Sequence, residues 1–215
     1  MSLIAVVDYG MGNLRSVSKA IEHVAKNSDR VIVSSNPADI NNADHVVFPG
    51  QGAARDCMHE LQARKLDAVV LKAAAEKPFL GICMGMQILL THSEENQGVE
   101  CLDLYPGNVR RFKDNMHDSE DLKLKVPHMG WNRVRWTQEH RLLENIAQDS
   151  RFYFVHSYFA EPSDSSLIAA RSDYGIDFAC ALAKDNVMAV QFHPEKSAAD
   201  GLQLLKNFCH WNGQP

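Results

Sequence analysis

Cys83 is flanked two residues away on each side by a glycine, where a short apolar run meets a helix-like run that starts at Met84. This G-x-C-x-G spacing is the cysteine version of a nucleophile elbow, a tight strand-to-helix turn that strains the nucleophile and needs small neighbours. A helix N-terminus favours thiolate over thiol there. The backbone N–H of Met84 would face a substrate carbonyl as an oxyanion donor. A buried core cysteine is the competing interpretation, and the paired glycines favour the nucleophile.

A base for such a nucleophile is offered near the C-terminus. An apolar run at 187–191 reads as a buried strand and is followed by His193, Pro194 and Glu195. Proline disfavours a helical conformation at His193. In an extended segment, side chains two residues apart point the same way, so the Glu195 carboxylate could fix the imidazole tautomer. An isolated histidine of this kind is usually a surface residue. Together with the elbow, it predicts a Cys83–His193–Glu195 triad.

The composition limits the classes of function. The 215 residues are 45% hydrophobic and 23% charged, as in soluble globular proteins, and we expect one domain over 1–215. The net charge of −5 argues against a nucleic-acid surface. No signal peptide or membrane span is expected. The five cysteines are odd in number and lack metal-ligand spacing, which predicts a reduced, cytoplasmic protein without a disulfide scaffold, a metal or another cofactor.

The elements that must position these residues follow a βαβα rhythm. Apolar runs at 3–7, 31–33, 46–48 and 79–82 predict strands, with helical sequence from residue 14 and again up to about residue 75. The middle, 91–135, is polar and less regular, with a charged loop expected at 114–120. Strand-like runs follow at 152–155, 167–170, 178–183 and 187–191, and a helix is expected at 198–211. This order predicts an open, mostly parallel twisted sheet with helices on both faces and an additional antiparallel region.

Three turns follow expected strands of that sheet, at 9–12, at 49–52 and at Cys83. Sites in open α/β sheets lie at the carboxyl ends of the strands, so these turns should converge. Gly10-Met11-Gly12 lacks the third glycine of a dinucleotide loop, because position 15 is Arg15. The turn around Gln51 is a plausible source of a second oxyanion N–H.

The segment Gly-Ile-Cys-Met-Gly-Met-Gln at 81–87, together with His-Pro-Glu at 193–195, resembles the class I, triad-type glutamine amidotransferases. Further segments at 8–14, 49–52, 128–132, 153–158 and 191–197 are similar to the glutaminase subunits of imidazole glycerol phosphate synthases. The resemblance covers essentially the whole chain. It implies that Cys83 attacks the carboxamide of L-glutamine and that His193 transfers protons while Glu195 orients it. Ammonia, and then glutamate, is released.

The resemblance also implies further roles. Met84 and Gln51 would supply the oxyanion N–H groups. A (β/α)8-barrel cyclase would receive the ammonia in a heterodimer, with Asn13 and Lys196 at the interface. Gln51 departs from the family pattern, in which small β-branched residues are more familiar. Residues implied to hold the glutamine are Gly52, Gln87, Glu95, Ser157 and Tyr158.

Other interpretations remain open at this level. The chain could supply ammonia to another acceptor, such as a sugar amidination enzyme, since the sequence separates such relatives poorly. A non-catalytic regulatory role is disfavoured by the intact triad. A cysteine peptidase or esterase is disfavoured by the set of Gln87, Glu95, Ser157 and Tyr158, which suits a small amino acid better than a peptide.

Overall fold

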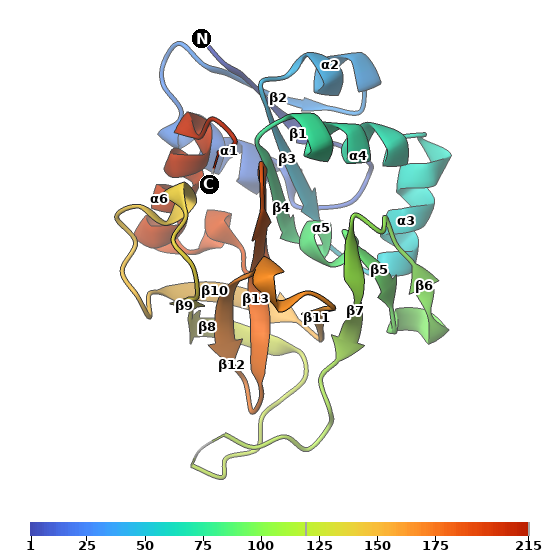
Figure 1. The fold of residues 1–215 in the computed structure, drawn as a ribbon, viewed down its shortest axis with the longest axis vertical. Helices are drawn as coiled ribbons and strands as arrows, with labels where there is room; N and C mark the ends of the chain where they lie inside the picture. Colours follow the sequence, from blue (N-terminus) through green and yellow to red (C-terminus); the bar gives the residue numbers. More distant parts are fainter. Residues whose placement is uncertain (119, 215) are drawn as a thin grey trace.

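The computed structural model describes residues 1–118 and 120–214, and its centre is an open, twisted sheet (Figure 1). The strands of this sheet follow the order β2-β1-β3-β4-β14-β13-β11-β7-β5-β6. One half is parallel and the other is largely antiparallel. The expected open α/β sheet with an added antiparallel region is therefore confirmed.

The parallel half is built from nearly continuous apolar strands, which are buried except for the edge strand β2. Such strands are typical of sheets that helices cover on both faces. They run in the order β2-β1-β3-β4-β14, and all four pairings are parallel. Their bounds are β1 Leu3–Val7, β2 Arg30–Ser34, β3 His45–Gly50, β4 Phe79–Cys83 and β14 Val187–Val190.

Helices cover both faces of this half (Figure 1). On one face α1 (Leu14–Val24) and α6 (Ala198–His210) pack in one core with Ile4 and Val6. On the other face lie α2 (Pro37–Asn42), α3 (Ala54–Ala63) and α4 (Asp67–Glu76). Their apolar residues pack in a second core with Ala5 and Val7. The alternation of β1 side chains between the two cores follows from the two-residue period of a strand.

Outside the parallel half, the runs expected at 152–155, 167–170 and 178–183 are confirmed as the strands β10, β12 and β13, and the other strands were not predicted. A separate two-stranded sheet, β8–β10, lies beside the antiparallel half. Short 3₁₀ helices complete the chain: η1 Glu95–Gln97, η2 Arg141–Leu143, η3 Ser165–Leu167 and η4 Pro194–Lys196. The strands are β5 Leu90–Ser93, β6 Val99–Glu100, β7 Tyr105–Arg111, β8 His128–Arg133, β9 Arg135–Trp136, β10 Arg151–His156, β11 Tyr158–Pro162, β12 Ile168–Asp173 and β13 Asp177–Lys184.

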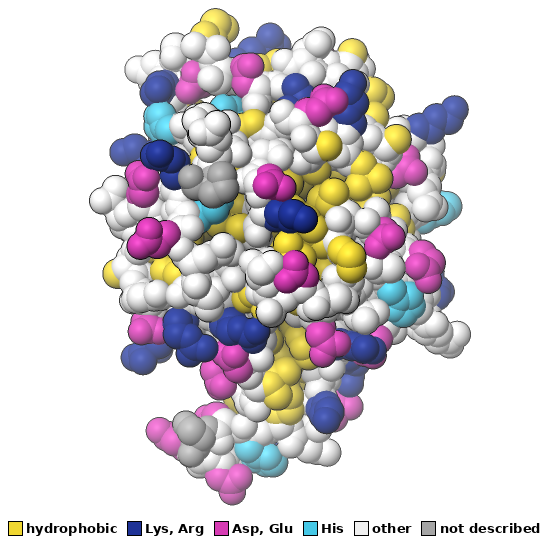
Figure 2. Space-filling view, viewed as in Figure 1, with side chains coloured by type: hydrophobic (Ala, Val, Ile, Leu, Met, Phe, Trp, Pro, Cys, Tyr) yellow, Lys and Arg dark blue, Asp and Glu magenta, His cyan; other side chains and the backbone are white. Residues whose placement is uncertain are grey.

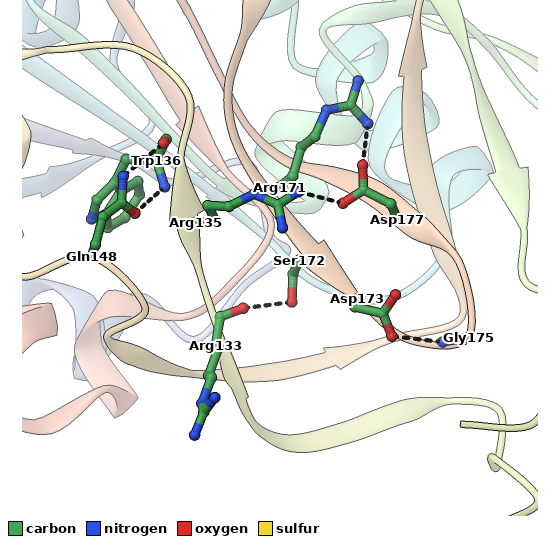
Figure 3. A network of polar contacts seen from close by, with 9 residues as sticks. All are labelled: Arg133, Arg135, Trp136, Gln148, Arg171, Ser172, Asp173, Gly175 and Asp177. Carbon is green, nitrogen blue, oxygen red and sulfur yellow. Dashed lines mark hydrogen bonds and ion pairs between the residues drawn. The ribbon is translucent and has the colours of Figure 1, made fainter. Parts of the chain in front are cut away.

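Polar contacts fasten the outer strands of this half (Figure 3). The Asp177 carboxylate accepts hydrogen bonds from Arg135 and Arg171, each at 3.0 Å. The Gln148 side chain accepts from the N–H of Trp136 at 2.7 Å and donates to its carbonyl at 2.8 Å. These contacts tie β9, β12 and β13 together away from the Cys83 turn.

Two local expectations differ from the structure. The helical stretch up to residue 75 is two helices, because Lys65 adopts a positive φ of 56° between α3 and α4. The stretch 91–135 is not merely irregular, since β5 ends in it and β6, β7 and β8 lie within it. In the charged loop expected at 114–120, residue 119 lies outside the described residues, and His117 forms an isolated bridge with Lys123.

The surface mixes charges of both signs. On the face in Figure 2, Lys and Arg side chains are interspersed with Asp and Glu around an apolar hollow. Among the described residues, no helix has the length and hydrophobicity needed to cross a membrane.

Candidate active site

The turn at Cys83 has the strained geometry expected of an elbow. Cys83 ends β4 with φ 56° and ψ −110°, a conformation that non-glycine residues rarely adopt. A Cβ on Gly81 would lie 2.8 Å from the carbonyl oxygen of Gly85, and one on Gly85 would overlap the carbonyl oxygen of Phe48. Both glycines are therefore required for the turn to close against β3.

The helix after the elbow is short. It starts at Met84 as expected, but α5 spans only Met84–Gln87 before the chain turns toward β5. One turn of aligned peptides contributes little of a macrodipole.

His193 is positioned by hydrogen bonds to both its ring and its backbone. Its Nδ1 lies 2.9 Å from Glu195 Oε1, and the two side chains are 8% and 1% exposed. Glu195 reaches the ring from a 3₁₀ turn, η4, and not from the extended segment that the sequence predicts. Ser197 Oγ donates to the carbonyl of His193 at 2.6 Å and accepts from the N–H of Tyr153 at 2.9 Å. Ser197 is a buried support that sequence reasoning missed.

The ionisation of His193 follows from these neighbours. Burial alone would lower the pKa of the imidazole, but its interactions with Cys83 and Glu195 outweigh burial and raise the pKa to about 10. Among the described residues, Nε2 has no hydrogen-bond partner. The arrangement favours an imidazolium that faces the sulfur, which is the form needed to protonate a leaving amine.

The turn 49–52 lies beside the elbow because β3 and β4 are paired in register, with Gly50 opposite Cys83. A Cβ on Gly50 would lie 2.5 Å from Tyr9 Oη, so only glycine fits there. Tyr9 Oη donates to Cys57 Sγ at 3.6 Å, and Cys57 Sγ donates to the carbonyl of Gln51 at 3.4 Å. Burial raises the pKa of Tyr9 well above its usual value and that of Cys57 to about 11, so both remain donors. Sequence reasoning missed this buried support.

One cavity of about 560 Å³ brings most of the sequence-predicted residues together. Cys83 and His193 line it together with the two predicted oxyanion residues and the five predicted substrate-binding residues. Glu195 lies behind His193, and Asn13 lies outside the cavity at the start of α1. The full lining is Met11, Gln51, Gly52, Cys83, Met84, Gln87, Glu95, Pro127, Val155, His156, Ser157, Tyr158, His193 and Lys196.

Glu94 and Glu95 point to different surroundings. Glu94 accepts from Arg110 at 2.5 Å outside the cavity. Glu95 lines the cavity, and its Oε2 accepts the N–H of Ala54 at 2.6 Å, which caps α3 in place of a side chain from that helix. Burial raises the pKa of Glu95. A cation in the cavity would counter this effect, so Glu95 suits an ammonium group.

A pair of buried histidines supports the cavity wall at Tyr158, and one of them, His156, lines the cavity itself. His156 Nδ1 donates to the carbonyl of Tyr158 at 2.8 Å, and His128 Nδ1 lies 2.9 Å from His156 Nε2. Burial lowers the pKa of His156 to about 3 and that of His128 to about 4, so both rings are neutral. With His156 Nδ1 protonated, His128 must donate to His156 Nε2. No sequence spacing signals this pair, because the two residues are 28 positions apart.

Comparison with known proteins gives a consistent result. The family model Glutamine amidotransferase class-I matches residues 5–211. The chain is 59% identical over 213 residues to imidazole glycerol phosphate synthase subunit HisH of Nitrosococcus oceani, covering 99% of each chain. It is 60% identical over 209 residues to the protein of the same name from Dechloromonas aromatica, covering 97% of this chain and 96% of the relative.

Solved structures share the fold at low identity. PurLQS from Thermotoga maritima superposes with a TM-score of 0.71 at 17% identity, covering 98% of this chain and 99% of that one. A second solved structure, of a glutamine amidotransferase, gives a TM-score of 0.70 at 15% identity, with 96% and 97% covered. The family match, the near full-length similarity and the shared fold lead to one conclusion. The chain belongs to the class I glutamine amidotransferases and, within them, to the family of HisH subunits of imidazole glycerol phosphate synthase.

Proposed function

We propose that the chain is a glutaminase that hydrolyses L-glutamine to glutamate and ammonia at Cys83. The observation that carries the proposal is the cavity itself, in which Cys83 on a strained turn faces a His193 that Glu195 holds at 2.9 Å. This is the nucleophile, base and orienting acid of acyl transfer. Residues 1–215 would form one amidotransferase domain, and a biosynthetic role suits the cytoplasm.

The reaction would proceed in two balanced halves. The Cys83 thiolate attacks the carboxamide carbon, and the N–H groups of Met84 and Gln51 stabilise the resulting oxyanion. The His193 imidazolium gives its proton to the nitrogen as the C–N bond breaks, which leaves a glutamyl thioester and free ammonia. Neutral His193 then removes a proton from water, whose oxygen attacks the thioester carbon. The C–S bond breaks, and glutamate leaves with the thiolate restored.

The cavity wall would recognise the amino-acid end of the substrate. Glu95 would bind the α-ammonium through the carboxylate oxygen that does not cap α3. Gly52, Gln87, Ser157 and Tyr158 line the rest of the cavity and would hold the remaining polar groups. A space of about 560 Å³ suits a single amino acid better than an extended peptide.

A partner would receive the ammonia, and we propose a (β/α)8-barrel cyclase in a heterodimer. Lys196 lies at the cavity and its Nζ is 5.9 Å from the ring of Tyr153. Tyr153 also contacts Trp131, which is 48% exposed, and Met129 nearby on β8 is 61% exposed. Exposed large apolar side chains beside a catalytic cavity are typical of a docking surface. Asn13 would lie at the edge of this interface.

The test is glutamate release by the purified chain, alone and with a barrel cyclase and its ribonucleotide substrate. We expect weak release alone and strong stimulation in the complex. Cys83→Ala should abolish glutamine-dependent synthesis while synthesis from added ammonia survives. Release that no cyclase stimulates would point to another acceptor. Loss of both activities in Cys83→Ala would mean that Cys83 is structural.

A further inference from the structure

Gln191 carries a buried amide that the mechanism above does not use. It follows β14, two residues before His193, and its side chain is fully buried among apolar neighbours. Its Nε2 lies 3.8 Å from Cys83 Sγ and its Oε1 lies 2.9 Å from Gln87 Nε2. The backbone N–H of Gln191 is already bonded to the carbonyl of Cys180 at 2.9 Å, so the strand does not need the amide for its pairing.

The orientation of this amide follows from one backbone carbonyl. The carbonyl oxygen of Tyr158 can only accept, so the Gln87 atom at 3.0 Å from it must be the amide nitrogen. That same nitrogen contacts Gln191, which must present its oxygen there. The NH₂ group of Gln191 is then left facing the sulfur of Cys83. The Tyr158 carbonyl also accepts a hydrogen bond from His156 Nδ1 at 2.8 Å. This second bond holds the carbonyl, from which the orientations of Gln87 and Gln191 follow.

We propose that Gln191 is a further catalytic residue, whose amide N–H donates to the Cys83 sulfur and aligns it toward the glutamine carboxamide. This inference rests on the proposed glutaminase function. A donor to sulfur favours the charged, attacking form, since hydrogen bonds to ionised groups are the stronger ones. The hydrogen bond from Gln191 to the sulfur weakens once the sulfur is bonded to the substrate carbon. It therefore stabilises the negative charge of the thiolate before the attack.

The same contacts tie the nucleophile to the substrate-binding wall. Gln87 donates to both Gln191 and the Tyr158 carbonyl, so one amide group links the two sides of the cavity. Gln87 Oε1 is buried and has no hydrogen-bond partner among the described residues. A glutamine at 191 has the reach to bridge Gln87 and Cys83, whereas asparagine is one methylene shorter.

The experiment replaces Gln191 by methionine, which is unbranched and apolar and removes both hydrogen bonds. The matched control is Gln148→Met, which removes an amide that makes two hydrogen bonds to Trp136 (Figure 3) and does not line the cavity. We expect kcat for glutamate release in the complex to fall about ten- to hundredfold in Gln191→Met, with KM changing less than about threefold. The control should retain wild-type kcat.

A second readout reports on the sulfur directly. The rate of Cys83 alkylation by iodoacetamide is followed by peptide mass spectrometry across pH. In Gln191→Met, the pH of half-maximal alkylation should rise by about one unit. An unchanged midpoint together with an unchanged kcat would overturn the proposal and leave Gln191 as a packing residue. If Gln191→Met does not fold, as judged by its melting temperature, Gln191→Asn replaces it, and the same two results decide.

The two proposals can fail separately. Wild-type protein that releases no glutamate with any partner would refute the glutaminase function. The alkylation comparison would still show whether Gln191 donates to Cys83. Conversely, a stimulated wild-type enzyme whose Gln191→Met and Gln148→Met variants behave alike would retain the function and refute the role of Gln191.

Discussion

The two walls of the candidate active-site cavity are held in place by different means. The wall of Cys83 and Gln51 stands on parallel strands, whose backbone pairing fixes both turns: Gly50 is opposite Cys83 on β3 and β4. The wall of Ser157 and Tyr158 stands where the chain crosses from the small sheet at β10 to the large sheet at β11. There, side chains do the positioning, through the histidine pair behind the Tyr158 carbonyl.

This difference assigns different sensitivities to the two walls. Backbone register tolerates changes in pH but leaves no room for an added atom, because carbonyl groups cannot move aside as side chains can. A side-chain network tolerates small changes in volume, but it depends on the protonation state of each member. The proposed chemistry and the proposed recognition should therefore fail under different perturbations.

The largest expected effect is steric and falls on the first wall. In Gly85→Ala the new Cβ would overlap the Phe48 carbonyl, so β3 and the elbow must separate. We expect a loss of about 10 °C or more in melting temperature, or loss of glutamate release by more than about 100-fold. The matched change on the second wall is Gly130→Ala on β8, where a Cβ meets nothing within 4 Å.

In Gly130→Ala, stability should fall only because alanine is strained at a φ of +136°. Its melting temperature should fall by no more than about 5 °C. Equal losses in the two variants would contradict the comparison, because they would mean that overlap with the Phe48 carbonyl costs no more than the positive φ at Gly130.

The predictability of the two walls from sequence differs for the same reason. Parallel, buried strands appear as apolar runs, so β1 and β4 and the residues at their ends could be placed from the pattern. The strand β7 could not, because it contains Pro106 and Gly107, two residue types that are depleted in strands, although its positions alternate in burial. The substrate-wall residues Ser157 and Tyr158 came from family resemblance and not from any period.

Side-chain networks leave little trace in a linear pattern. His128 and His156 are separated by 28 residues and look ordinary until the fold places them 2.9 Å apart. Gln191 does leave a signal, since it is a lone amide in an otherwise apolar run beside the triad histidine. A buried amide needs partners, so that position could have been marked as one whose bonds matter.

The second prediction perturbs the second wall by pH. His128 and His156 have native pKa values of about 4 and about 3, below the unfolded value of about 6.5. The unfolded chain therefore binds more protons as pH falls below about 6.5. The neutral histidines contribute stability above that pH and lose it progressively toward pH 4, by up to about 1.4 kcal/mol per pH unit for each ring.

The measurement is the free energy of unfolding in urea between pH 7.5 and 5. Wild-type protein should lose stability as the pH falls, and His128→Gln should lose it less steeply because it has one fewer titrating ring. Burial between Phe154 and Tyr174, whose rings stack on His128, explains why the neutral form is favoured. Identical slopes in the two proteins would show that His128 does not titrate with unfolding.

The smallest expected effect comes from a test of whether Gln51 acts through its side chain or through its backbone. Gln51 is exposed, and the contact that positions it is made by its carbonyl, which accepts from Cys57. Gln51→Val should therefore keep kcat/KM in the complex within about twofold of wild type. Cys57→Ala removes the donor to that carbonyl and should lower kcat more than KM, by about fivefold for one hydrogen bond. If Gln51→Val were instead the more damaging change, the Gln51 side chain would take part in catalysis, and backbone positioning alone would not account for the first wall.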